Sequence, residues 1–386
     1  SVLDTVKDKY NQSHLPVREQ ITAEGHCVRA CYLYSAMADL AFETNDQELY
    51  QACKRIFYDI IGKKMYITGG IGSSRVRESF TAPYDLKNDR AYAETCAAIS
   101  LMFFAHRMMR FENDSVYADI IERILYNGMI SGLSLDGKAF FYENPLEINL
   151  NNRMRPGETY AITNRVAVFE CSCCPPNLNR VLASVGDYIY GYDGETVYVN
   201  QFAGSEAQIE NMHIIQETDF PKSNTIRFKT DNVKRLCVRI PKWCASFGAD
   251  KGYKTVNGYA VIDDPGKEVT VKLDMTPFLM QGNSLVDEDS GKAAVCCGPY
   301  VCAAEAIDNT ENLHTIFMDK SFSASYEYSD YMKGFTLKVK AFRKITDDKL
   351  YSKYSENFED FTLNMIPYAA FANRGESNMC VWFNVR

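Results

Sequence analysis

The sequence lacks the features that mark several common classes of protein. No stretch of Lys and Arg dominates its 386 residues, and the formal net charge is -8, which argues against a nucleic-acid partner. No apolar run approaches the roughly 20 residues that a helix needs to cross a bilayer. The first residues, Ser1-Val2-Leu3-Asp4, have neither the basic flank nor the apolar run of a signal peptide. We therefore expect a soluble, cytoplasmic protein that binds neither nucleic acid nor membrane.

The cysteines do not form the even framework of a small secreted domain. There are 13 of them, scattered singly or gathered in two clusters at 171–174 and 296–302, which favours reduced thiols in a cytoplasm. The pair Cys296-Cys297 stands in an expected strand with no acid or histidine cluster nearby. This context favours a buried pair over a second metal site.

Hydrophobic periodicity divides the chain near residue 190. Apolar residues recur at helical spacing before that point and alternate in short runs after it. The predicted fold is multidomain, with a helical domain over 1–190 and β-sandwich domains over 191–282 and 283–386. The expected helices are Arg18–Phe42, Gln47–Ile61, Tyr92–Phe111, Ser115–Ile130 and Asn177–Tyr190. The expected strands lie at 196–199, 225–228, 236–240, 269–273, 293–297, 335–339 and 380–384.

A glycine-serine loop, Thr68-Gly69-Gly70-Ile71-Gly72-Ser73-Ser74, interrupts the helical part. Glycines in a loop can cradle a phosphate, but here no Lys-Ser or Lys-Thr pair follows to complete a P-loop. The loop is therefore predicted to connect elements rather than to bind a nucleotide.

The strongest chemical signal is Phe169-Glu170-Cys171-Ser172-Cys173-Cys174-Pro175-Pro176-Asn177, which puts three thiols within four residues. The prolines fix their own φ and favour an extended Cys174 on a stiffened turn before a helix. Adjacent thiolates on rigid backbone suit a soft metal, and zinc first.

An acid and a thiol that could complete this site are Glu94 and Cys96, in Ala91-Tyr92-Ala93-Glu94-Thr95-Cys96-Ala97. On a regular helix, positions i and i+2 point about 200° apart. Both side chains can therefore bind one ion only at an irregular or first turn. The alternative is a buried cysteine beside a solvated glutamate.

At these motifs the chain resembles glycoside hydrolase family 127, the β-L-arabinofuranosidases. The resemblance runs along the whole sequence. It is carried by 16–20 (PVREQ), 25–30 (GHCVRA), 69–72 (GGIG) followed by Glu78, 91–97 (AYAETCA), 140–146 (FFYENPL), 171–177 (CSCCPPN) and 372–375 (ANRG).

The resemblance implies part of an (α/α)6-barrel catalytic domain followed by β-sandwich domains. It also implies a zinc ion held by Glu94, Cys96, Cys173 and Cys174, with Cys173 as nucleophile and Glu78 as general acid/base. The implied function is a retaining glycoside hydrolase that releases L-arabinofuranose from the non-reducing end of β-L-arabinofuranosides. A metal-bound thiol is ionised outright, and a buried Glu78 beside that anionic site would have a raised pKa.

Three further residues are expected in the sugar pocket. The family places the histidine at position 26 there, where an imidazole can bond a hydroxyl; a surface or capping role is the alternative. Tyr142 can stack on or bond the furanose, and Glu122 can also line the pocket. Their alternatives are a core tyrosine and a solvated helix face.

Some questions stay open at the level of sequence. The first 190 residues supply only about half of the helices of the barrel, so an N-terminal part is expected in a longer protein or a separate chain, unless the fold is cut down. The β-sandwiches can touch the glycoside or form a homodimer. Two rival functions are the same machinery acting on another sugar of plant glycans, and a non-catalytic glycan-binding protein with a structural zinc site.

Overall fold

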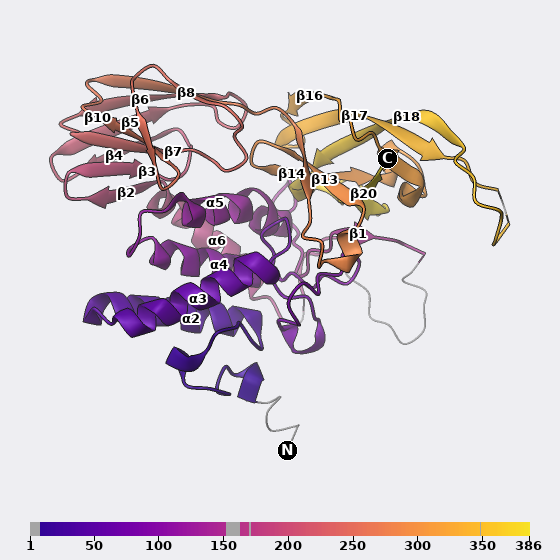
Figure 1. The fold of residues 1–386 in the computed structure, drawn as a ribbon, viewed down its shortest axis with the longest axis horizontal. Helices are drawn as coiled ribbons and strands as arrows, with labels where there is room; N and C mark the ends of the chain where they lie inside the picture. Colours follow the sequence, from indigo (N-terminus) through magenta and orange to yellow (C-terminus); the bar gives the residue numbers. More distant parts are fainter. Residues whose placement is uncertain (1–7, 152–162, 170, 348) are drawn as a thin grey trace.

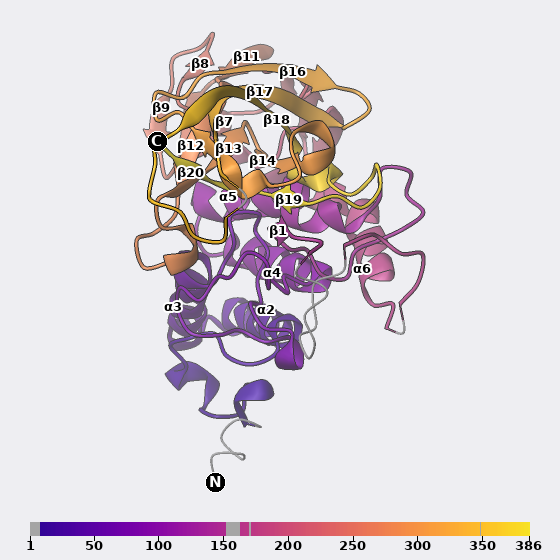
Figure 2. The same ribbon diagram turned by 90° about the vertical axis from the view of Figure 1, so that its right-hand side faces the viewer.

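A computed structural model describes residues 8–151, 163–169, 171–347 and 349–386. The residues used above to argue against a signal peptide, Ser1 to Asp4, lie outside them. Helices occupy the first part of the chain and strands the rest, as the periodicity predicts (Figure 1). The two β regions lie side by side on one face of the helical layer, and the chain begins on the opposite side of that layer (Figures 1 and 2).

In the helical region, the α-helices that position the site are α2 (Cys27–Thr44), α3 (Gln47–Lys63), α4 (Thr95–Met108), α5 (Ser115–Arg123) and α6 (Cys174–Ala183). Asp46 and Asp114 cap α3 and α5, because each carboxylate accepts a hydrogen bond from a backbone N–H of the first turn. Helix α4 lies at the centre of the apolar core of this region, with α2, α3 and α5 packed against it.

Three helix boundaries differ most from the sequence prediction. Helix α2 begins at Cys27 rather than near Arg18, because His26 is extended and Gly25 has φ +72°, which a right-handed helix cannot include. Helix α6 ends at Ala183 rather than near Tyr190, and a 3-10 turn, Val185–Tyr188, follows it. After α5 the chain does not continue as an α-helix. It forms a π-helical turn, Ile124–Met129, and a 3-10 turn, Ile130–Gly132.

The middle β region is a sandwich of two five-stranded sheets. Its core is formed by the inward-facing residues of both sheets, Ile226, Phe228, Leu236 and Val271 among them. One sheet has the order β2 (Tyr190–Asp193), β3 (Thr196–Val199), β7 (Arg235–Arg239), β10 (Tyr259–Asp263) and β9 (Lys254–Val256). The other has the order β4 (Ser205–Ile209), β5 (Met212–Glu217), β6 (Thr225–Asp231), β11 (Glu268–Leu273) and β8 (Phe247–Ala249).

The C-terminal β region closes on itself and is a small barrel where the sequence suggested a second sandwich. Its strands are β12 (Phe278–Gln281), β13 (Lys292–Cys297), β14 (Tyr300–Glu305), β15 (Ile316–Met318), β16 (Ala324–Ser329), β17 (Gly334–Lys344), β18 (Phe358–Pro367), β19 (Met379–Cys380) and β20 (Trp382–Val385). Pairing runs β14, β18, β17, β15, β20, β13 and back to β14. Closure removes the exposed sheet edges that an open sandwich keeps. Short strand β1 (Glu147–Ile148), from the helical region, pairs with β19.

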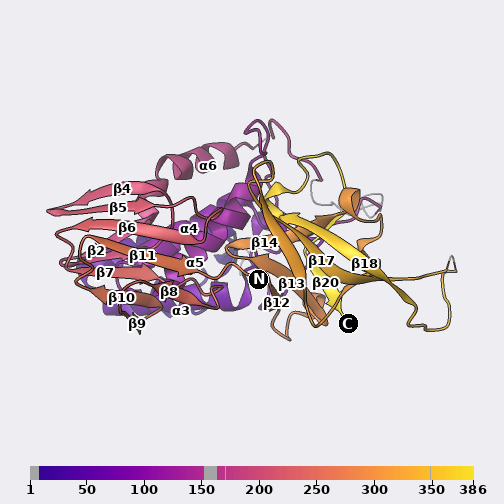
Figure 3. The same cartoon turned by 90° about the horizontal axis from the view of Figure 1, so that it is seen from above.

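Buried polar contacts join the helical region to both β regions, which lie next to each other when seen from above (Figure 3). Arg239 of β7 is fully buried and forms ion pairs with Asp119 and Glu122 of α5. Asn127, in the π-helical turn, donates to the Pro299 carbonyl and accepts from the Val301 N–H. In the described part of the chain no helix is both long and apolar enough to span a membrane.

Candidate active site

Three helices begin at the same place in the helical region. The N-cap residues of α2, α4 and α6 are His26, Glu94 and Cys173. Each helix start presents the positive end of its dipole, which stabilises negative charge by about 0.3–1 kcal/mol. The convergence therefore favours anionic side chains in the space between the three helix ends.

Glu94 and Cys96 share this space because Glu94 stands just outside α4. Its φ and ψ are -56° and 136°, an extended conformation, whereas Cys96 is in the first helical turn. The first-turn geometry that the sequence argument required is thus present. The backbone of Glu94 also pairs with that of Glu143, and the Thr95 N–H donates to the Tyr142 carbonyl, 3.0 Å away.

The two adjacent thiols lie at the start of α6. Cys174 is already helical, where the sequence argument expected an extended residue, because prolines in a first turn lack only N–H groups that a helix leaves unpaired there. The Cys173 Sγ lies 3.6 Å from the Cys96 Sγ, 3.7 Å from the Cys174 Sγ and 3.6 Å from the Glu94 Oε1.

These four side chains can hold a metal ion. Their ligand atoms all lie within 4.8 Å of one another. Among the described residues the buried Glu94 Oε2 has no hydrogen-bond partner, and a buried carboxylate oxygen without a partner is costly unless it binds a cation. Three sulfurs and one carboxylate oxygen around one point therefore fit a metal ion in chemistry and in spacing.

A second group of side chains surrounds Glu78. Its Oε2 lies 2.7 Å from the His26 Nε2, and its Oε1 accepts from the Tyr92 hydroxyl at 2.7 Å and from the Tyr142 hydroxyl at 3.2 Å. His26 Nδ1 accepts from the Arg29 N–H, so the ring proton is on Nε2, facing Glu78. Glu78 itself has φ +54°, a strained value for a residue with a side chain.

Tyr142 connects the two groups. Besides Glu78, its hydroxyl lies 3.5 Å from the Cys173 Sγ. Glu78 and Cys173 face a common cavity of about 610 Å³, which His26, Glu94, Cys96 and Tyr142 also line. Arg180, on α6, lines the same cavity and donates to Tyr32 and Asn177.

The thiols and carboxylates perturb one another strongly. Hydrogen bonds from the Cys174 and Cys96 thiols lower the pKa of Cys173. Burial and the nearby Cys173 raise the pKa of Glu94 to about 9. A cation bound here lowers the pKa of each ligand and allows them to be ionised together.

The position of Glu122 corrects the expectation that it lines the sugar pocket. It is buried at the contact with the middle β region, where it accepts from Arg239 and, at 2.7 Å, from the Trp243 Nε1. It is not among the residues that line the cavity around Cys173. A carboxylate paired with a fully buried guanidinium stabilises the contact between the two regions.

The sequence argument missed Tyr92, which donates to Glu78 at 2.7 Å. It lies two residues before Glu94, in the 91–97 motif that predicted only metal ligands. A tyrosine next to alanines carries no signal of its own, so only the proximity of Glu78 in space identifies it.

The fold and the site define a multidomain protein in which a helical domain, with three thiols and a carboxylate that can hold a metal ion, is followed by two β domains. Three family profiles match it in order: "Beta-L-arabinofuranosidase, GH127 catalytic domain" at residues 2–187, the GH127 middle domain at 196–275 and the GH127 C-terminal domain at 277–384. The chain belongs to glycoside hydrolase family 127, as the sequence motifs predicted.

Characterised relatives agree with this assignment. A non-reducing end β-L-arabinofuranosidase from Bifidobacterium longum is 35% identical over 97% of this chain and 62% of its own length. The crystal structure of a GH127 β-L-arabinofuranosidase from Geobacillus stearothermophilus T6 superposes with a TM-score of 0.92 at 38% identity, over 98% of this chain and 63% of that one. Another GH127 β-arabinofuranosidase gives a TM-score of 0.86 at 35% identity, over 100% and 64%. The chain thus spans less than two thirds of the length of these relatives.

Proposed function

We propose that this chain carries the active site of a retaining β-L-arabinofuranosidase, with Cys173 as nucleophile and Glu78 as general acid/base. The observation that carries the proposal is the hydroxyl of Tyr142, which contacts the Cys173 Sγ at 3.5 Å and the Glu78 Oε1 at 3.2 Å. These contacts keep the two groups less than about 7 Å apart, compatible with the spacing of about 5–5.5 Å found in retaining glycosidases. The sugar and its linkage are inferred from the activity named for the Bifidobacterium and Geobacillus relatives.

Zinc is the proposed ion of the cluster, held by Glu94, Cys96, Cys173 and Cys174. Thiolates with one carboxylate form a donor set that zinc accepts in four-coordinate sites. When bound, the ion keeps its thiol ligands deprotonated at neutral pH, where a free thiol is ionised only to a few per cent.

The residues of the chain then divide the reaction in two steps. The Cys173 sulfur attacks the anomeric carbon, the bond from that carbon to the leaving oxygen breaks, and the Glu78 proton moves to that oxygen. In the second step Glu78 takes a proton from water, the water oxygen bonds to the anomeric carbon, and Cys173 leaves. His26, Tyr92 and Tyr142 orient the Glu78 carboxyl and stabilise its charge after the first proton transfer.

A structural metal site in a glycan-binding protein is the second candidate, because four ligands close the coordination shell. Such a site has no need of an acid oriented by His26 and two tyrosines in the same cavity. The arrangement around Glu78 therefore favours the enzyme, and the same machinery acting on another sugar is the nearer rival.

The test is hydrolysis of a chromogenic β-L-arabinofuranoside by the chain, beside Cys173→Ser, Glu78→Gln and an α-linked substrate. We expect turnover of the β-anomer only, and its loss in both variants. Zinc content and thermal stability should stay nearly unchanged in Glu78→Gln. A loss of metal or fold in that variant would support the structural role, and turnover of a different sugar alone would overturn the proposed specificity.

A further inference from the structure

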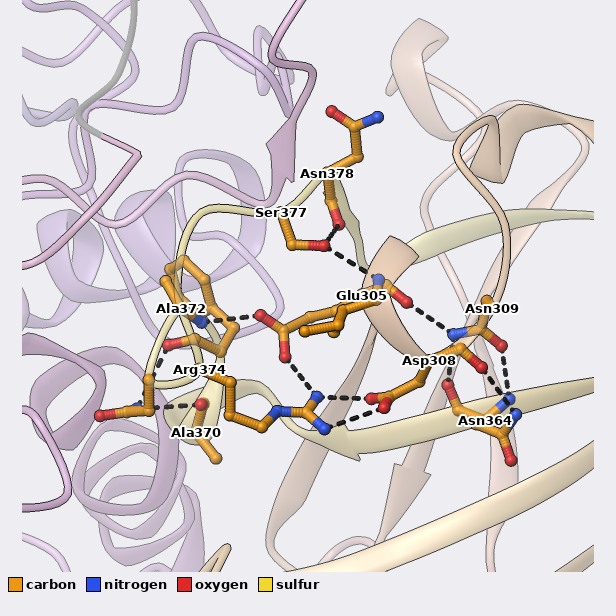
Figure 4. A network of polar contacts seen from close by, with 12 residues as sticks. Glu305, Asp308, Asn309, Asn364, Ala370, Ala372, Arg374, Ser377 and Asn378 are labelled. Carbon is orange, nitrogen blue, oxygen red and sulfur yellow. Dashed lines mark hydrogen bonds and ion pairs between the residues drawn. The ribbon is translucent and has the colours of Figure 1, made fainter.

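A polar network holds one loop of the C-terminal barrel, whose residues are not among those that line the cavity around Cys173. The loop follows β18 and contains the motif Ala372-Asn373-Arg374-Gly375. The Arg374 guanidinium forms ion pairs with Glu305, at 2.7 Å, and with Asp308, while the other oxygen of Glu305 accepts the Ala372 N–H at 2.8 Å (Figure 4). Glu305 is 1% exposed, so its carboxylate is shielded from water, and its contacts with Arg374 and Ala372 fix the backbone of the loop.

The carbonyls of this loop and of the helical region meet at one arginine. The Arg165 guanidinium donates to the Phe371 carbonyl, to the Ala369 carbonyl at 3.1 Å and to the Ser131 carbonyl at 2.8 Å. The central carbon of this guanidinium, Cζ, also lies over the ring of Phe141, 4.4 Å from the ring centroid. A planar fork of donors can satisfy three carbonyls at once, which a lysine ammonium on a flexible stem cannot do with the same geometry.

The residues after Arg165 lead to the thiols. Val166 exchanges two backbone hydrogen bonds with Phe140, at 2.9 and 3.0 Å, and the Phe169 ring packs on the rings of Phe140 and Tyr142. The Ser172 hydroxyl then donates to the Phe169 carbonyl at 3.1 Å. Phe140, Phe169 and Tyr142 belong to the same apolar cluster as Cys96, Cys173 and Cys174.

We propose that Arg165 is a positioning residue through which the C-terminal barrel sets the place of the segment that carries Cys173. This gives the barrel and its 372–375 motif a part in the chemistry without contact with the sugar. The inference rests on the proposed role of Cys173, but its test can be read from metal binding alone. Partners that orient metal ligands from outside the coordination shell are typically worth about 10–100-fold in metal affinity or activity.

The experiment compares Arg165→Met and Arg165→Lys with the full chain, and uses Arg343→Met as a matched control. Arg343 pairs with Glu359 on the exposed surface of the barrel. Co(II) is the probe, because its thiolate absorption band reports ligation directly. For Arg165→Met we expect Co(II) affinity about tenfold weaker, an altered band, and a kcat at least tenfold lower with KM within about threefold. Arg165→Lys should recover part of the loss, and the control should match the full chain.

Two outcomes overturn the proposal. One is a lower melting temperature in Arg165→Met with an unchanged Co(II) band, affinity and kcat, which would leave Arg165 a purely structural role. The other applies if Arg165→Met fails to fold. The near-isosteric Glu305→Gln is then measured instead: a two- to threefold loss of Co(II) affinity is expected, and an unchanged affinity would contradict the proposal. Should the full chain bind Co(II) but hydrolyse no arabinofuranoside, the proposed function fails while the binding data still judge Arg165.

Discussion

Two tyrosine hydroxyls share one carboxylate oxygen at the centre of the site. Tyr92 and Tyr142 both donate to the Glu78 Oε1, and Tyr142 alone also reaches Cys173. Burial, with the nearby carboxylates, raises the pKa of both phenols, so both keep their protons at neutral pH. Of these two tyrosines, Tyr142 is therefore the one that contacts both the proposed nucleophile and the proposed acid/base.

Replacing Tyr142 with phenylalanine should lower kcat about ten- to a hundredfold, because it removes the hydroxyl that donates to Glu78 and contacts the Cys173 Sγ. The ring and its packing on Phe169 remain, so the free energy of unfolding should change by less than about 1 kcal/mol. Steady-state kinetics and urea unfolding measure the two effects. Tyr354→Phe, at an exposed tyrosine whose hydroxyl donates to Glu356, is the control. Equal kcat in the two variants would remove Tyr142 from the mechanism.

At the scale of elements, the glycine loop that resembled a phosphate cradle is a packing element. Its backbone lies against the π-helical turn Ile124–Met129, where the Gly128 N–H donates to the Thr68 carbonyl at 2.9 Å. Farther along the loop, the Gly72 carbonyl accepts from the Ala93 N–H at 2.8 Å, next to Glu94. The loop thus supports the start of α4 and the proposed metal ligand Glu94.

Gly128→Ala should destabilise the protein by about 1–3 kcal/mol, the range for forcing a methyl group into a packed interior. The added Cβ would lie 2.8 Å from the Thr68 carbonyl oxygen and 3.1 Å from the Gly70 nitrogen, which are backbone atoms that cannot rotate away. Urea unfolding measures the change. Gly186→Ala, where a Cβ meets nothing within 4 Å, should be nearly neutral. Equal stability of the two variants would show that the glycine loop at 68–74 can shift to make room for the added methyl group at little cost.

At the scale of the whole molecule, the loop after Glu78 is attached to the C-terminal barrel. The Asn88 amide donates to Asp289 at 2.8 Å, and Lys87 pairs with Glu288 at 3.3 Å. Burial raises the pKa of Asp289 to about 6, well above the value of about 3.9 expected in the unfolded chain. This contact between regions should therefore depend on pH.

Between about pH 4 and 6 the unfolded state releases the Asp289 proton while the folded state keeps it. The folded state then binds more protons, so the free energy of unfolding falls as the pH rises through this window. Asp289→Asn keeps the shape without the charge. From pH 4 to pH 7, the free energy of unfolding of the unaltered chain should fall by about 1–2 kcal/mol relative to that of the variant. Urea midpoints at both pH values check this, and a constant difference would mean that Asp289 titrates normally.

The sequence by itself determined the family and the order of helices before strands, and it pointed to the four side chains that the fold brings together as a candidate metal site. These follow from local properties: apolar periodicity, the run of thiols before two prolines, and motifs that are contiguous in the chain. The requirement that Glu94 and Cys96 share a first turn could also be deduced from helix geometry alone, and the N-cap position of Glu94 meets it.

Only the tertiary structure decided which side chains share the cavity and which do not. Tyr92 lies beside Glu78 in the folded chain. Glu122 lies outside the cavity, because its carboxylate pairs with the buried Arg239, from a strand more than 100 residues away. The closure of the C-terminal barrel likewise depends on pairing between strands distant in sequence. So does the contact of Arg165 with the Ala369 carbonyl, which joins the segment before Cys173 to that barrel. Such contacts leave no local pattern, since hydrogen bonding and burial across regions depend on where the folded chain brings each group.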